Sequence, residues 1–220
     1  MKIGFFGGSF NPPTMAHTHL AKLAIERLNL DKIVFVPIGD FYSKKDLVPI
    51  DLRIKMLEII CEKENKKENK FEVSDIEKNF KEKKYAIDIF KIIEEEYKDH
   101  DFYFLMGADN FSKIPKWKDY DKLKNYKYIV FERNESIENI DLNKFKNVYL
   151  INTDFTKDIS STAIRNNVKN KNKNININKN NNKNKKTINL NVNEEKAENI
   201  FDKSLDEDVE KFIYNNKLYI

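Results

Sequence analysis

The stretch Met1–Leu20, MKIGFFGGSFNPPTMAHTHL, decides the fold. Its first part is a nearly continuous apolar run, which is typical of a strand buried on both faces of a parallel sheet. The run ends in Gly7 and Gly8, whose missing side chains let a ligand approach the backbone closely. Thr14 and His17 then open a predicted helix, where free backbone amides and the positive end of the helix dipole attract phosphate. The stretch therefore predicts a strand, a turn and a helix with a phosphate site at the turn, although a capping or packing histidine would also fit position 17.

Similar apolar runs recur along the first 150 residues and alternate with amphipathic segments. The predicted strands are Lys2–Gly7, Lys32–Pro37, Phe71–Ser74, Phe102–Met106, Lys127–Glu132 and Val148–Asn152. The clearest predicted helices are Thr18–Leu28, Leu52–Cys61 and Ile87–Tyr97. This alternation predicts an α/β fold, namely a doubly wound, Rossmann-like, mostly parallel sheet with helices on both faces. Ligands of such sheets bind at the carboxyl ends of the strands, near the point where the strand order reverses.

Length and composition predict one globular domain. The chain has 220 residues, of which 40% are hydrophobic and 35% are charged. No apolar run approaches the roughly 20 residues of a membrane helix, and the N-terminus does not resemble a signal peptide. The single cysteine, Cys61, permits no internal disulfide. We therefore expect no membrane partner and a cytoplasmic protein, or a nuclear one by diffusion.

The net charge of +4 comes from one segment. Residues 166–193 contain seven lysines and no acidic residue, so the rest of the chain has 33 basic against 36 acidic residues, a net charge of −3. A basic groove across the domain, and with it a nucleic-acid partner, is not expected. Half of residues 166–193 are asparagine and no helical or strand period persists, which predicts a disordered insertion at about 168–193. A lysine-rich nucleic-acid tether or localisation signal is the alternative. Beyond it, Val209, Phe212, Ile213 and Leu218 form an apolar stripe expected to dock on the sheet.

A second phosphate site is predicted at Asp158–Arg165, DISSTAIR. Ser160 and Ser161 suit the start of a helix, and Arg165 follows one turn later. Helix capping alone would also explain the serines. If the two predicted corners face each other, they hold opposite sides of a triphosphate.

Taken in order, these motifs resemble a known family. GGSFNPPTMAH resembles the GxFxPxTxxH signature of the nucleotidylyltransferase superfamily, and DISSTAIR resembles its ISSTxxR signature. The lysine-bearing loop that starts at Gly39, the sequence Gly107-Ala-Asp-Asn with Trp117 downstream, and the closing VEKFIYNNKLYI are similar to the nicotinate/nicotinamide mononucleotide adenylyltransferases. The resemblance covers the whole chain except the Asn/Lys-rich insertion.

The resemblance implies that the chain transfers the AMP moiety of ATP to nicotinate or nicotinamide mononucleotide, giving a dinucleotide and pyrophosphate in a late step of NAD biosynthesis. It implies catalytic roles for His17, Lys44 and Arg165. The residues implied for ATP binding are Gly8, Ser9, Phe10, His17, Lys44, Lys45, Gly107, Asp109, Ser160, Ser161, Thr162 and Arg165. Those implied for the mononucleotide are Tyr42, Tyr85, Asp88, Trp117 and Arg133.

The expected mechanism is in-line attack of the mononucleotide phosphate on the α-phosphorus of ATP, without a covalent intermediate. Mg²⁺ is expected on the ATP phosphates, because the sequence has no carboxylate cluster for a metal. Two alternatives stay open. Pantetheine-phosphate adenylyltransferase shares the first motif, but it does not explain the GAD…W and ISST motifs together. A lysine-rich nucleic-acid-binding module could explain the net charge, but it leaves the folded body without a role. The preference between the two mononucleotides and the oligomeric state, a homo-oligomer included, are not determined by the sequence.

Overall fold

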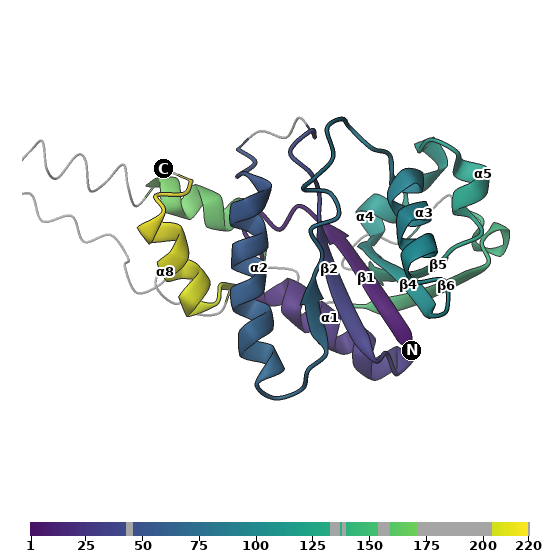
Figure 1. The fold of residues 1–220 in the computed structure, drawn as a ribbon, viewed down its shortest axis with the longest axis horizontal. Helices are drawn as coiled ribbons and strands as arrows, with labels where there is room; N and C mark the ends of the chain where they lie inside the picture. Colours follow the sequence, from purple (N-terminus) through teal and green to yellow (C-terminus); the bar gives the residue numbers. More distant parts are fainter. Residues whose placement is uncertain (43–45, 133–136, 138–139, 154–158, 171–203, 220) are drawn as a thin grey trace, which may run out of the picture.

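Six strands form one parallel sheet in the computed structural model, which describes residues 1–42, 46–132, 137, 140–153, 159–170 and 204–219. The order is β3-β2-β1-β4-β5-β6, and every pair of neighbours is parallel (Figure 1). The strands are β1 Lys2–Gly8, β2 Lys32–Pro37, β3 Phe71–Val73, β4 Asp101–Gly107, β5 Lys127–Glu132 and β6 Asn147–Asn152. The order reverses at β1, which lies between β2 and β4, so a ligand crevice is expected at the carboxyl ends of these strands. The predicted fold class is confirmed.

Helices cover both faces of the sheet, which explains why β1, β2, β4 and β5 are buried over most of their length, whereas the edge strand β6 is largely exposed. Successive residues such as Phe5 and Phe6 point to opposite faces and enter different hydrophobic clusters. One face packs against α1 (Met15–Leu28) and α2 (Ile50–Asn65). The other packs against α3 (Ala86–Glu96) and a series of short helices. The short helices are α4 Ala108–Phe111, η1 Ile114–Lys116, α5 Tyr120–Leu123 and, further on, η2 Leu142–Lys144.

Two of the helices are longer than their apolar patterns predict. The first helix begins at Met15, because Thr14 is still extended, with a φ of −124°, and caps it. Helix α2 runs from Ile50 to Asn65, beyond the predicted Leu52–Cys61 at both ends. No helix within the described ranges is long and apolar enough to cross a bilayer.

The last helix, α8 (Glu207–Asn215), packs on α2 and not on the sheet, as Figure 1 shows. Its partner is a helix over residues 161–170, and the three helices share a hydrophobic cluster that contains no strand residue. The prediction that the C-terminal stripe docks on the sheet is therefore wrong.

The first residues of the predicted insertion, placed at about 168–193, belong to a helix. Residues 161–170 are helical, and Val168 is only 2% exposed because it lies one turn after Ile164 in the same cluster. The helix thus extends into the asparagine-rich sequence. The remainder of the predicted insertion, 171–193, lies outside the described residues, and its disorder stays a prediction.

Candidate active site

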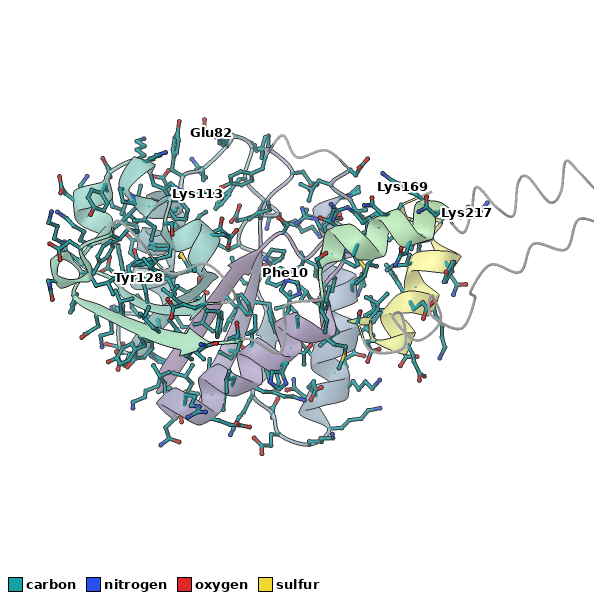
Figure 2. The ribbon with its side chains drawn as sticks, turned by 180° about the vertical axis from the view of Figure 1, so that it is seen from behind. Phe10, Glu82, Lys113, Tyr128, Lys169 and Lys217 are labelled. Atoms are coloured by element: carbon teal, nitrogen blue, oxygen red, sulfur yellow. The ribbon has the colours of Figure 1, made fainter. Side chains whose placement is uncertain are left out.

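The loop between β1 and α1 lies at the carboxyl end of the central strand. Phe10 has a φ of 44°, and its side chain is 1% exposed beneath the loop. A Cβ atom on Gly8 would come within 2.9 Å of the Phe10 ring, so a larger residue would have to displace that ring. Figure 2 shows Phe10 in the middle of the molecule, between the half that contains Tyr128 and the end that contains Lys169. The packed ring fixes the path of the loop.

The orientation of His17 is set by the residue that caps its helix. The backbone N–H of Thr14 donates to His17 Nδ1 at 3.0 Å, and the Thr14 hydroxyl lies 2.8 Å from the same nitrogen. Because a backbone N–H can only donate, Nδ1 must accept, and the neutral imidazole then carries its proton on Nε2. The ring also stands edge-on to Phe10, with centroids 5.1 Å apart. His17 therefore presents Nε2–H as the donating group of a fixed ring.

The helix over residues 161–170 is bonded directly to this loop. The hydroxyl of Ser161 donates to the carbonyl oxygen of Pro12 at 2.8 Å. Arg165 Nη1 donates to the carbonyl oxygen of Asn11 at 2.8 Å, and Nη2 donates to Thr162 Oγ1 at 3.1 Å. Two motifs about 150 residues apart in sequence thus form one corner, as expected if both bind the same phosphates.

A cavity of about 630 Å³ opens between these two motifs and the end of β4. It is lined by nine of the residues predicted for ATP, namely Gly8, Ser9, Phe10, His17, Gly107, Asp109, Ser161, Thr162 and Arg165. The cationic Arg165 and the start of α1, which has no acidic residue in its first turn, favour an anion at one end. Asp109 is the acidic residue of the lining, and a Cβ atom on Gly107 would come within 2.6 Å of its carboxylate. We call this space the phosphate cavity.

A second cavity, of about 490 Å³, adjoins the first. Tyr42, Tyr85 and Trp117, all predicted for the mononucleotide, line it. The Tyr42 hydroxyl donates to the carbonyl oxygen of Lys84 at 2.8 Å. Burial, with help from the nearby Glu77 and Asp88 carboxyls, raises the pKa of Tyr42 to about 12, so this hydroxyl stays protonated. The aromatic walls suit a flat ring, and we call this space the aromatic cavity.

The two cavities meet at the end of β1, because both are lined by Gly7, Gly8, Ser9 and Asn110. Molecules bound in the two cavities would therefore meet at the Gly-rich loop. This shared edge lies where β1 and β4 separate, at the reversal point of the sheet.

Some predicted site residues do not line either cavity. The carboxylate of Asp88 accepts the backbone N–H of Tyr85 at 3.0 Å and so caps α3. Ser160 accepts the backbone N–H of Ala163 at 3.1 Å and is exposed at the start of its helix. Lys44, Lys45 and Arg133 lie outside the described residues, so their roles stay predictions.

Arg53 was not predicted, although it is bonded to the loop between β1 and α1, which we call the phosphate loop. Its side chain is fully buried, and its guanidinium donates to the carbonyl oxygens of Val48 (2.6 Å) and Ser9 (3.1 Å) and to Asp40 (2.8 Å). Burial lowers the pKa of Arg53, and the bond to Asp40 opposes that shift. The sequence feature that could have indicated its burial is its position on the apolar stripe of α2, three residues after Ile50.

Within the described residues, no group of three or more His, Cys, Asp or Glu side chains is arranged to hold a metal ion.

Comparison with known proteins assigns the family. The sequence model of the family described as cytidylyltransferase-like matches residues 5–167. A protein of Fusobacterium nucleatum named probable nicotinate-nucleotide adenylyltransferase is 38% identical over 178 residues, which cover 78% of this chain and 89% of that protein. The chain belongs to the nicotinate-nucleotide adenylyltransferase family. A second member, from Clostridium novyi, is 33% identical over 77% of this chain and 88% of its own length.

A solved structure of the family has the same fold over nearly the whole chain. The Plasmodium falciparum nicotinic acid mononucleotide adenylyltransferase in complex with NaAD is 26% identical, covers 99% of this chain and 97% of its own, and gives a TM-score of 0.73. The family, the enzyme class and the AMP-transfer reaction predicted from the sequence are confirmed.

Proposed function

We propose that the phosphate cavity binds ATP, that the aromatic cavity binds nicotinate mononucleotide, and that AMP is transferred where the two cavities meet. The observation that carries this proposal is the shared edge at Gly8 and Ser9. A reaction between two nucleotides needs two adjoining sites, and holding both reactants in line accounts for a large part of such a rate enhancement. The relatives named as nicotinate-nucleotide adenylyltransferases support the choice of substrates.

In this reaction an oxygen of the mononucleotide phosphate attacks the α-phosphorus of ATP. The new P–O bond forms as the bond to the β-phosphate breaks, and pyrophosphate leaves with the electron pair. His17 Nε2–H and the first amides of α1 would donate to the phosphate oxygens as charge develops on them. Arg165, fixed by its bond to Asn11, would bind the departing β- and γ-phosphates. Lys44 and Lys45 would approach the triphosphate from the loop after β2.

Mg²⁺ would accompany ATP, held by phosphate oxygens and water, and would neutralise charge on the triphosphate. No protein ligand is assigned to it here.

Nicotinate mononucleotide, whose ring carries a carboxylate, suits the aromatic cavity better than nicotinamide mononucleotide, whose ring carries an uncharged amide. Four lysines line the cavity, namely Lys83, Lys84, Lys116 and Lys118. The Lys118 ammonium lies 4.7 Å from the centroid of the Tyr85 ring, so a positive charge stands beside an aromatic wall. A pyridine ring that carries a carboxylate would stack on Trp117 and gain from these charges.

The deciding experiment measures pyrophosphate release from ATP and Mg²⁺ with each of three acceptors. We expect turnover with nicotinate mononucleotide, a lower kcat/KM with nicotinamide mononucleotide, and none with phosphopantetheine. Turnover with phosphopantetheine alone would refute the proposal, and a preference for the nicotinamide substrate would refute the role of the lysines. We also propose a cytoplasmic location, because the single cysteine, Cys61, permits no internal disulfide.

A further inference from the structure

The side chain of Asn11 connects the phosphate loop to the segment after β2. Its Nδ2 donates to the carbonyl oxygen of Asp46 at 2.8 Å, and its Oδ1 accepts the backbone N–H of Val48 at 3.2 Å. Asn11 and Leu47 both line the phosphate cavity, and Asn11 is only 5% exposed. The Asn11 amide therefore helps to set the position of one wall of the phosphate cavity.

A residue 208 positions away completes that connection. The hydroxyl of Tyr219 donates to Asn11 Oδ1 at 2.9 Å, and the Tyr219 side chain is 7% exposed. Burial raises the pKa of Tyr219 well above its usual range, so the hydroxyl stays protonated and remains a donor. Tyr219 itself lines neither cavity, and its hydroxyl is linked to the lining of the phosphate cavity by its bond to Asn11.

The backbone reaches this position at a conformational cost. Lys217 and Tyr219 have φ values of 52° and 62°, in the left-handed region that large side chains disfavour. These residues follow α8, whose apolar side packs on α2. Strain of this kind persists where the surrounding structure enforces it, and it is often found at functional sites. Here the strained turn brings a phenol hydroxyl to a buried amide oxygen.

We propose that Tyr219 is a positioning residue for ATP: its hydroxyl fixes the Asn11 amide and thereby holds the segment from Asp46 to Val48 against the phosphate loop. The segment is also tied at its outer end, where Lys169 pairs with Asp46 at 2.9 Å. The last residues of the chain thus complete the ATP site assigned in the proposed function, on which this inference rests.

The test is Tyr219→Phe, which keeps the ring and removes only the hydroxyl. Loss of one neutral hydrogen bond changes an equilibrium by about threefold to tenfold. We therefore expect the Kd for ATP, measured by calorimetry, and the KM for ATP to rise about threefold to tenfold, while the KM for nicotinate mononucleotide changes less than twofold. The matched control is Tyr214→Phe, on the same segment but 39% exposed, which should leave all three constants unchanged.

A double-mutant cycle with Asn11→Ala makes the test specific, because Tyr219→Phe should have no further effect once its acceptor is gone. A Tyr219→Phe protein that melts at a lower temperature but binds ATP like the wild type would overturn the inference, since the hydroxyl would then serve stability alone. Equal changes in both KM values would overturn it as well. ATP binding is measured without turnover. An inactive wild type would therefore refute the proposed function, while the Kd values for ATP would still test the role of Tyr219.

Discussion

Arg53→Met tests whether the phosphate loop depends on a buried cation of α2. The substitution keeps most of the side-chain volume but removes all three hydrogen bonds of the guanidinium. Asp40 is about half exposed, with 49% of its side chain accessible, so water can replace the lost partner there. The bond to the carbonyl oxygen of Val48 is buried and the bond to that of Ser9 is partly buried, and methionine offers neither oxygen a donor.

The expected loss of stability follows from those two carbonyls. A buried acceptor without a donor costs about 1–3 kcal/mol. Two of them cost about 2–6 kcal/mol, and the gain from no longer burying a charge reduces the expected loss to about 1–5 kcal/mol. In a protein of this size each kcal/mol shifts Tm by about 2–4 °C, so the melting temperature should fall by roughly 2–20 °C.

Urea unfolding followed by circular dichroism measures the loss, and Lys55→Met is the matched control. Lys55 lies two residues further along α2, is 65% exposed, and pairs with Glu58, so its removal should change the unfolding free energy by less than about 0.5 kcal/mol. Arg53→Lys keeps the charge without the fork of donors and should give an intermediate value. A loss below about 1 kcal/mol for Arg53→Met would refute the reasoning.

Four further changes test the site and the insertion. His17→Ala should lower kcat about 100-fold to 1,000-fold with little change in KM for nicotinate mononucleotide, since it removes a donor to the reacting phosphate; unchanged turnover in a folded variant would contradict its role. Trp117→Ala should raise the KM for the mononucleotide about tenfold or more, because ring stacking is worth about 1–3 kcal/mol. A rise in the KM for ATP instead would show that Trp117 contacts ATP and not the mononucleotide. Burial raises the pKa of Glu77, so ionisation of this carboxyl lowers the stability of the fold as the pH rises through that pKa. Glu77→Gln can still accept the Gly39 N–H, and it should therefore stabilise the protein against urea at pH 8 and not at pH 4. Equal effects at both pH values would exclude this account. Replacing residues 171–192 with a short Gly/Ser linker should leave Tm and turnover nearly unchanged, because loop length costs little; a drop in turnover of more than tenfold at constant Tm would show that the lysines act on ATP.

The sheet was predictable because its strands carry a strong local signal. A strand with both faces buried is apolar along its buried length, and the runs Ile3–Phe6 in β1 and Tyr103–Met106 in β4 satisfy this without reference to the rest of the chain. The grouping of Gly8, His17 and Arg165 around one cavity was predictable for a similar reason, since they belong to two short motifs. The contact between the motifs, from Ser161 to Pro12, follows from the parallel topology that brings strand ends together.

The contacts that brace this corner could not be read from the sequence in the same way. Arg53 lies within an apolar helical pattern, and only the fold shows which carbonyls it meets. The burial of Val168 could not be predicted from nearby residues, because the composition around it resembles that of a disordered segment. Its burial depends on α8, about 40 residues later. Tertiary packing overrides local propensity where a side chain completes a cluster contributed by distant segments.

These distant contacts also explain how the fold can accommodate the predicted Asn/Lys-rich insertion next to its active site. The helix over residues 161–170 and α8 belong to the same hydrophobic cluster, so both ends of the intervening chain are held by packing that does not depend on its length. Each doubling of such a connection costs only about 0.6 kcal/mol, less than the burial of one aliphatic side chain such as Val168 or Val209, which is worth about 1.5–3 kcal/mol. The same arrangement makes the phosphate corner sensitive to the C-terminus, since Asn11 is bonded to Arg165 before the insertion and to Tyr219 after it. Substitutions that weaken the cluster without touching either cavity should therefore impair ATP binding before they unfold the sheet.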